Sequence, residues 1–197
     1  MEELPSFILT GFALAGSPGP TTLSLAAAGA AFGARRCLAF MGGVMLGMLG
    51  VIAITASGVT GVLLALPGAT PVMAVLAACY FAYLAFRIAS APPLTEASAV
   101  RRHPSVAGGV VLSLVNPKAY AAMASLFAGF VLVRGDLGWD VAAKTSAVVG
   151  ILIVVNVAWL TAGAALTRYL RAPRSNRIIN VTFAVLLIGS VGFALLI

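Results

Sequence analysis

Six long apolar stretches divide this chain, and they constrain its fold more than any other feature. They cover residues 5–32, 38–66, 69–91, 106–132, 140–168 and 177–196. About 20 apolar residues are enough for an α-helix to cross a bilayer. The stretches are continuous apolar runs, whereas the strands of a transmembrane β-barrel alternate apolar and polar residues. The sequence therefore predicts an all-α polytopic membrane protein with six transmembrane helices.

Composition agrees with this prediction. Of all residues 61% are hydrophobic and only 9% are charged, which is outside the range of ordinary soluble domains. Six spans with short loops use all 197 residues, so we expect one transmembrane domain over residues 1–197. The net charge of +7 comes from residues scattered through the loops, without a nucleic-acid-binding motif. We assign these charges to topology and to the anionic headgroups of the lipid bilayer, and expect no nucleic-acid partner.

The basic residues predict the orientation of the chain. Nine arginines fall on one side of the predicted spans: Arg35, Arg36, Arg87, Arg101, Arg102, Arg168, Arg171, Arg174 and Arg177. The other side carries few charges: Arg134, Lys144, Asp136, Asp140, Glu2 and Glu3. The positive-inside rule therefore places the three arginine-rich loops in the cytoplasm and both termini outside. In this arrangement we expect every acidic residue to lie in a tail or a loop.

Lys118 is the only charged residue deep inside an apolar stretch. It follows Asn116 and Pro117 at the midpoint of residues 106–132. A bare ammonium at this depth needs a partner, a water-filled cavity or the loss of its proton. Roughly 18 Å of helix separate Lys118 from the start of its span, which is farther than a lysine side chain reaches. Lys118 is therefore the first candidate for a functional residue.

Two proline motifs lie at similar depth in the first and fourth stretches, 99 residues apart. They are Ser17-Pro18-Gly19-Pro20 and Asn116-Pro117-Lys118. Proline lacks an N–H and clashes with the preceding turn, so each motif should break its helix. Carbonyls released in this way must be buried in protein or line an aqueous cavity. Simple helix kinks are the alternative interpretation, which a lone proline would leave open.

The matched breaks indicate an internal repeat. Each half holds three spans, about 5–91 and 106–196, joined by a cytoplasmic connector at about 92–105. An odd number of crossings turns the second half over, so the two three-helix repeats must be inverted. Paired interrupted helices in inverted repeats are typical of a transporter whose binding site lies at the membrane midplane.

Motifs along the whole chain carry a family resemblance. They are Ser17–Pro20, a glycine-rich second stretch, Tyr80–Arg87, Gly109–Ala119 and Arg177–Asn180 with Gly189. In order and spacing they resemble the LysE/RhtB family of the lysine exporter superfamily, six-span amino-acid efflux transporters of the bacterial inner membrane. The resemblance implies proton-coupled export and these signature positions: Pro18, Gly19, Pro20, Asn116, Pro117, Lys118 and Asn180. Thr21 and Ala78-Cys79 depart from the family pattern and leave the substrate open.

Lys118 is suited to pair with a substrate carboxylate. Hydrogen-bonding candidates nearby are Ser17, Thr21, Thr22 and Asn116, and released carbonyls can accept from a substrate ammonium. Asn156 and Asn180 either complete this polar site or form interhelical hydrogen bonds. Without an acidic residue inside a span, a cationic substrate lacks a partner, so we expect small neutral amino acids or related metabolites. For proton antiport Lys118 is the hypothetical coupling residue, because burial disfavours a charged lysine.

Three other functions fit the sequence less well. An exporter of inorganic or heavy-metal cations would need carboxylates or thiols, and no metal ligands are assigned. A membrane thiol-redox relative of the same fold would need paired cysteines, whereas Cys37 and Cys79 lack CxxC spacing. Ser17 and Lys118 also resemble the nucleophilic pair of a hydrolase, although their flanking prolines suit a transport break better. We therefore expect neither an enzyme nor a cofactor.

Glycine pairs predict close helix contacts. Gly29 and Gly33, and then Gly43 and Gly47, have the spacing that lets helix backbones approach one another. The contacts lie either within one chain or between the two chains of a homodimer.

Overall fold

A computed structural model describes residues 3–58, 104–165 and 173–196, and also positions 75, 79, 82, 83, 85, 86, 89 and 90. The described residues form helices and connecting segments, without a β-strand among them. The predicted all-α fold is confirmed. The predicted third span, 69–91, and the connector at 92–105 lie outside the described residues, apart from the single positions just given and residues 104 and 105.

The first apolar stretch forms two helices, α1 (Leu4–Gly16) and α2 (Pro20–Phe32). Ser17 and Gly19 are extended between them, and Pro20 occupies the first turn of α2, where its missing N–H costs nothing. The backbone N–H of Gly19 donates to the Thr22 hydroxyl at 2.9 Å, which caps α2. The predicted break in this stretch is confirmed.

The fourth stretch is broken in the same way. Helices α6 (Val106–Leu114) and α7 (Pro117–Gly129) meet at an angle of 62°. Pro117 begins α7, and the Asn116 side chain caps it by accepting from the Lys118 N–H at 3.2 Å. This predicted break is confirmed too.

The other described helices are η1 (Arg35–Cys37), α3 (Leu38–Ala56), α8 (Leu137–Ala165) and α9 (Pro173–Leu196). Helix α3 ends earlier than the predicted span 38–66. Gly58 follows it with φ of 76°, in the left-handed region that commonly ends a helix. Residues 59–66 lie outside the part of the chain that the structure describes.

Within the described residues, two helical segments are long and apolar enough to cross a membrane, Arg35–Ala56 and Leu137–Ala165. The bent pair of α6 and α7 makes a third if it crosses as one span. Shorter apolar helices are Leu4–Gly16 and the segment Arg177–Leu186 of α9.

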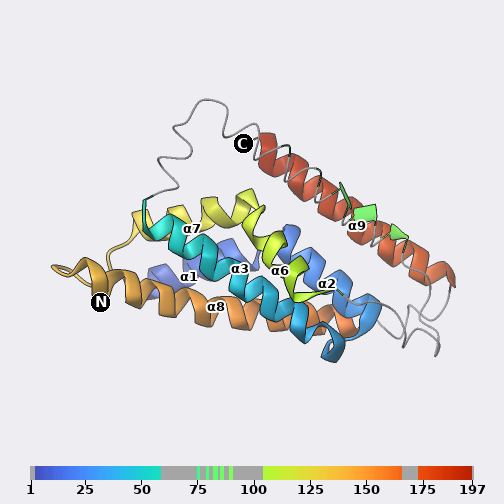
Figure 1. Cartoon of the computed structure of the whole chain (residues 1–197), viewed down its shortest axis with the longest axis horizontal. Helices are drawn as coiled ribbons and strands as arrows, with labels where there is room; N and C mark the ends of the chain where they lie inside the picture. Colours follow the sequence, from blue (N-terminus) through green and yellow to red (C-terminus); the bar gives the residue numbers. More distant parts are fainter. Residues whose placement is uncertain are drawn as a thin grey trace.

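Helices α3 and α8 run the length of the bundle, as Figure 1 shows. Helices α1 and α7 lie toward one end of it, and α2 and α6 lie toward the other (Figure 1). Helix α9 packs against α2 at the edge of the bundle. The two helix breaks therefore come near the middle of the bundle.

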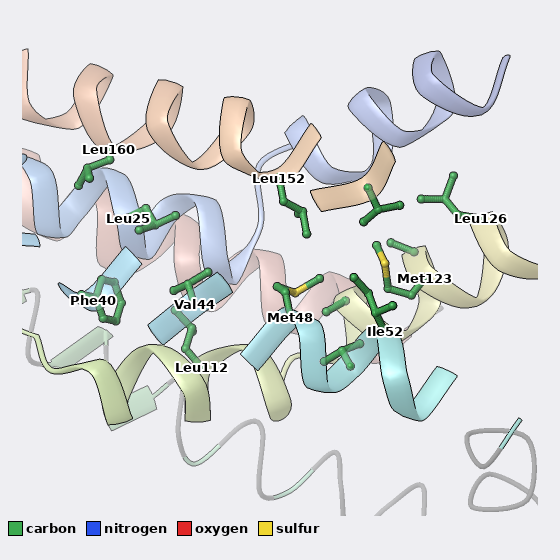
Figure 2. Close-up of a cluster of buried hydrophobic side chains, with 14 of the residues drawn as sticks. Leu25, Phe40, Val44, Met48, Ile52, Leu112, Met123, Leu126, Leu152 and Leu160 are labelled. Atoms are coloured by element: carbon green, nitrogen blue, oxygen red, sulfur yellow. The ribbon is translucent and has the colours of Figure 1, made fainter. Parts of the chain in front are cut away.

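Apolar side chains fill the space between these helices (Figure 2). Leu25 of α2 and Leu160 of α8 are both buried, and so are Val44 of α3 and Leu112 of α6. In lipid, helices associate through close packing and interhelical hydrogen bonds, because the lipid tails are as apolar as the side chains. Tight contacts between these helices are therefore essential to the fold.

Glycines allow the closest contacts. A Cβ atom on Gly29 of α2 would overlap the Leu160 carbonyl of α8, and one on Gly163 would overlap the Ala26 carbonyl in return. Gly43 of α3 and Gly109 of α6 are likewise in contact with backbone across the α3–α6 crossing. The predicted contacts at these positions lie within one chain, so the glycine spacing no longer supports a homodimer.

The prediction of a close helix contact is wrong for Gly33 within this chain. Its φ is 81°, and no atom within 4 Å would meet a Cβ there. It ends α2, with its N–H bonded to the Gly29 carbonyl at 2.8 Å. A residue with positive φ strongly favours glycine, so the chain needs glycine here for its conformation.

Candidate functional site

The two helix breaks touch each other, although they are far apart in the sequence. The Asn116 side-chain amide donates to the Thr21 hydroxyl at 2.9 Å. Lys118, in the first turn of α7, reaches across to the break between α1 and α2. The site is therefore built where both interrupted helices expose backbone.

The Lys118 ammonium lies inside the first break. Its Nζ donates to the Ser17 carbonyl at 2.8 Å, to the Ser17 hydroxyl at 2.7 Å and to the Pro18 carbonyl at 3.2 Å. An ammonium has three N–H donors, so all three have an acceptor. These partners explain how a lysine is tolerated at this depth. They also correct one expectation, since two of the released carbonyls accept from Lys118 and are not left open for a substrate.

Gly19 makes room for the lysine side chain. A Cβ on Gly19 would lie 2.9 Å from both Cδ and Nζ of Lys118, which is closer than carbon atoms approach without displacement. Gly19 is extended, so any residue could adopt its backbone conformation. The reason for glycine at this position is space.

Trp159 also contacts the first break, and the sequence analysis missed it. Its indole N–H donates to the Gly16 carbonyl at 3.2 Å, from the last third of α8. A buried tryptophan N–H usually has a hydrogen-bond partner, so a tryptophan within an apolar helix was a usable signal. The Ser17 hydroxyl meanwhile donates back to the Leu14 carbonyl at 2.9 Å.

A cavity of about 50 Å³ lies beside the two breaks. Its lining residues come from five helices and both breaks: Leu14, Ala15, Gly19, Pro20, Thr21, Thr22, Met48, Asn116, Lys118, Ala119, Ala122, Met123, Leu152 and Asn156. This volume has room for a few water molecules. The lining combines polar side chains such as Thr21, Asn116 and Asn156 with apolar ones such as Met48 and Met123.

Most of the predicted site residues meet at this cavity. Those that line it are Gly19, Pro20, Thr21, Thr22, Asn116, Lys118 and Asn156. Ser17 touches it through Lys118. Pro18 is exposed and Pro117 is half-buried, and neither lines the cavity. Asn180 is buried on α9 and is not among the lining residues.

Asn156 shows an unusual pairing. Its side chain is buried, and its amide donates to the sulfur of Met45 at 3.2 Å. A thioether is a weak acceptor, so this bond can be exchanged at little cost for one to a better acceptor. Met48, Met123 and Leu152 form the apolar part of the lining, and the sequence analysis had not included them in the site. Met123 lies on the same face of α7 as Ala119, at helical spacing, which was the available signal.

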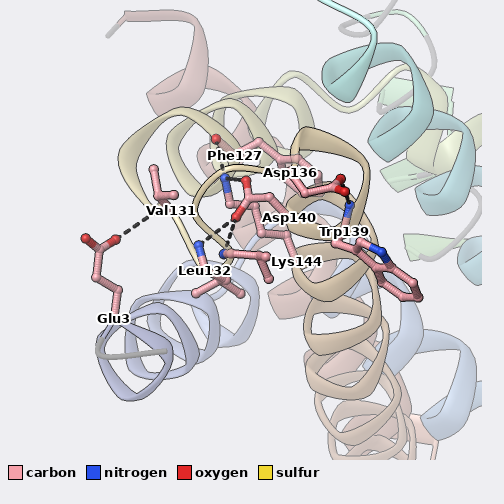
Figure 3. Close-up of polar contacts among 9 residues, drawn as sticks. Glu3, Phe127, Val131, Leu132, Asp136, Trp139, Asp140 and Lys144 are labelled. Atoms are coloured by element: carbon pink, nitrogen blue, oxygen red, sulfur yellow. Dashed lines mark hydrogen bonds and ion pairs between the residues drawn. The ribbon is translucent and has the colours of Figure 1, made fainter.

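A second buried polar cluster lies at the start of α8 (Figure 3) and shares no residue with the cavity lining. Asp140 and Lys144 form an ion pair of 2.6 Å, and both side chains are almost fully buried. Asp140 also accepts from the N–H groups of Leu132 and Val133, at 2.6 and 2.9 Å. The expectation that every acidic residue lies in a tail or loop is wrong for Asp140, because α8 begins at Leu137.

Other chemistries find little support in the described residues. In that part of the chain, His, Cys, Asp and Glu form no group of three that could hold a metal ion. Cys37 is buried, Cys79 is exposed, and both are free. The cysteine pair of a thiol-redox protein is therefore not formed by these two residues.

The whole chain can be compared with known proteins. No curated protein and no solved structure matches it. The sequence model of the LysE type translocators matches residues 12–197, nearly the entire chain, and confirms the resemblance seen in the motifs. With its long apolar helices, this protein is a membrane-embedded translocator, and the chain belongs to the LysE type translocator family.

Proposed function

We propose that this protein is a secondary transporter that exports small neutral amino acids or related metabolites from the cytoplasm by proton antiport. Membership of a translocator family supports transport in general. The observation that carries the more specific proposal is the Lys118 ammonium, which borders a partly polar cavity between two broken helices. A buried cation beside a cavity is suited to bind a carboxylate.

The cavity offers a place for each part of an amino acid. The carboxylate pairs with Lys118 and takes over at least one of its three hydrogen bonds. The carbonyl that Lys118 releases, with Asn156, then accepts from the substrate ammonium. Met48, Met123 and Leu152 contact the substrate side chain. Thr21, Thr22, Asn116 and Ser17 orient these groups.

Transport requires the cavity to change size. A volume of about 50 Å³ holds a few waters but is small for an amino acid. The substrate therefore binds when the helices around the breaks move apart, as alternating access requires. The lysine exchanges its proton as the substrate enters and leaves, which would couple export to the proton gradient.

The proposed architecture has six spans in two inverted repeats, residues 5–91 and 106–196, in the inner membrane with both termini outside. The matching breaks after α1 and α6 support the repeat, because each falls in the first half of its apolar stretch, after the 13 residues of α1 and the 9 residues of α6. Asn180, in the last helix of the second repeat, is a more distant member of the site.

Counterflow in proteoliposomes tests the function. Purified protein is reconstituted with an unlabelled neutral amino acid inside, and uptake of the labelled compound is followed for a panel of amino acids. We expect Lys118→Met to weaken apparent affinity by about 10- to 150-fold, because hydrogen bonds to a charged group contribute about 1.5 to 3 kcal/mol. Lys118→Arg keeps the charge and should retain partial exchange.

Arg134→Met is the matched control, because it removes an exposed cation that does not line the cavity. It should exchange amino acids as the parent does. Unchanged, proton-coupled exchange by Lys118→Met would refute the proposed role of the ammonium. Absence of exchange by the parent with every amino acid would refute the substrate class.

A further inference from the structure

The two ends of the bundle are packed in different ways. At the end formed by α2 and α6, backbone lies directly on backbone. Gly163 of α8 is in contact with the Ala26 carbonyl of α2, and Gly43 of α3 with the Val106 carbonyl of α6. Such contacts leave no side chains that could repack, so α2 and α6 cannot shift without losing them.

At the other end, α1 is held by side chains. A Cβ on Gly11 would meet the tip of the Ile151 side chain at 2.6 Å, and Trp159 binds the last carbonyl of α1. Side chains can change rotamer, and α1 is separated from α2 by three extended or irregular residues. Ser17–Gly19 is therefore a hinge about which α1 can tilt as a unit while α2 stays in place, once the contacts that hold α1 are released.

The start of α1 contacts the segment that follows α7. The rings of Phe7 and Phe130 pack edge to face, with centroids 5.5 Å apart and an interplanar angle of 89°. Phe7 is completely buried. The Glu3 carboxylate accepts from the Val131 N–H at 2.8 Å (Figure 3). These two contacts join α1 to the end of α7.

The partner of α1 in this contact is firmly anchored. Asp140 binds the N–H groups of Leu132 and Val133, directly after Phe130 and Val131. Lys144 pairs with Asp140 and also donates to the Phe127 carbonyl at 3.0 Å (Figure 3). This buried cluster attaches the segment after α7 to α8. If the Phe7–Phe130 contact opens, α1 is therefore the element that moves.

The contact between Phe7 and Phe130 joins α1 to the end of α7, two of the helices that line the cavity. The cavity is lined by the end of α1 and the first turns of α7, and by no residue of α6. Phe7 is ten residues before Ser17, or roughly 15 Å along the helix. A solute that left the cavity along α1 and α7 toward these helix ends would reach this aromatic pair.

We propose that α1 is a gate of the translocation path, closed by Phe7 on Phe130, and that Lys118 holds it closed until a carboxylate takes over its hydrogen bonds. This inference rests on the proposed function, because it assumes a carboxylate substrate. All three N–H groups of the ammonium donate to oxygens of the α1–α2 break. A carboxylate can therefore bind the ammonium only by replacing one of its hydrogen bonds to Ser17 or Pro18. Substrate binding thereby frees α1 to tilt. In the proposed topology this gate faces the outside.

Accessibility of a cysteine in the cavity tests the gate. Ala122→Cys is placed in the full chain with Cys37 and Cys79 replaced by alanine, since Ala122 lines the cavity and is almost buried. A membrane-impermeant thiol reagent is applied from either face of reconstituted vesicles. We expect slow labelling in this parent and at least tenfold faster labelling from the outer face with Phe7→Ala or Lys118→Met.

Phe12→Ala is the matched control, because Phe12 lies on the same helix with 39% of its surface exposed. It should label at the parent rate. Glu3→Gln and Phe7→Leu are milder changes that should accelerate labelling less. Melting temperatures show that each variant is folded.

The outcomes separate this inference from the proposed function. Equal labelling rates for the Phe7 and Phe12 variants, or acceleration only from the cytoplasmic face, would overturn the gate even if the parent exchanges amino acids. If Phe7→Ala accelerates labelling while Lys118→Met labels at the rate of the parent protein, Lys118 does not hold the gate closed. Acceleration by both variants supports the gate, even if the counterflow panel finds no substrate.

Discussion

Gly19 is the residue whose substitution tests the site most directly. The Lys118 side chain lies where a Cβ on Gly19 would be, so Gly19→Ala must displace the ammonium from Ser17 and Pro18. We expect substrate exchange to fall at least tenfold, because each hydrogen bond to a charged group is worth about 1.5 to 3 kcal/mol. The melting temperature should fall as well. Counterflow and thermal unfolding in detergent measure the two effects.

Gly42→Ala is the control for this prediction. Gly42 is exposed on α3, and no atom within 4 Å would meet its Cβ. Alanine favours a helix over glycine by up to about 1 kcal/mol, so this variant should be as stable as the parent or more stable. Equal exchange by the Gly19 and Gly42 variants would show that Lys118 does not need its present position.

At the scale of the helices, the α2–α8 crossing depends on Gly163. A Cβ there would overlap the Ala26 carbonyl, which cannot move away because it belongs to the α2 backbone. We expect Gly163→Ala to destabilise the protein by about 1 to 3 kcal/mol, as overpacking does elsewhere. Gly150→Ala on the same helix should be neutral or stabilising, since nothing lies near that position. Thermal unfolding of both variants measures these effects. A Gly163→Ala variant as stable as the parent protein would contradict this packing.

Helix boundaries and breaks were largely predictable, because they depend on residues close in sequence. Apolar runs predicted α1 with α2, α6 with α7, and α8, and the prolines predicted where two of the runs break. The end of α3 was missed by ten residues. Its apolar run continues past Ala56, and only Gly58, in a left-handed conformation, marks the end. A single glycine within an apolar stretch is a weak signal.

At the scale of the whole molecule, the testable expectation is topology. The nine arginines of the predicted cytoplasmic loops predict that both termini lie outside. A protease-cleavable tag on either terminus should therefore be cleaved in spheroplasts, whose outer membrane has been removed, and one inserted in residues 92–105 should be protected until the inner membrane is opened. The rule depends on charge, so adding lysines to the amino-terminal tail should reduce cleavage there. Protection of both terminal tags in spheroplasts would reverse the orientation and place the α1 gate on the cytoplasmic side.

The sequence alone determined the class of the protein and where two of its helices break. Long apolar runs are typical of membrane-spanning helices, and a proline within such a run ends a helix, because it lacks an N–H and clashes with the preceding turn. Those are local properties of the chain.

Only the tertiary structure decided which groups meet. It brought Lys118 to the carbonyls of Ser17 and Pro18, and Asn156 to the sulfur of Met45. It also buried Asp140, which was expected in a loop, in an ion pair with Lys144. These pairings depend on how helices distant in sequence pack together. Hydrogen bonding and burial of charge are set by the three-dimensional surroundings, and the order of residues along the chain does not specify them.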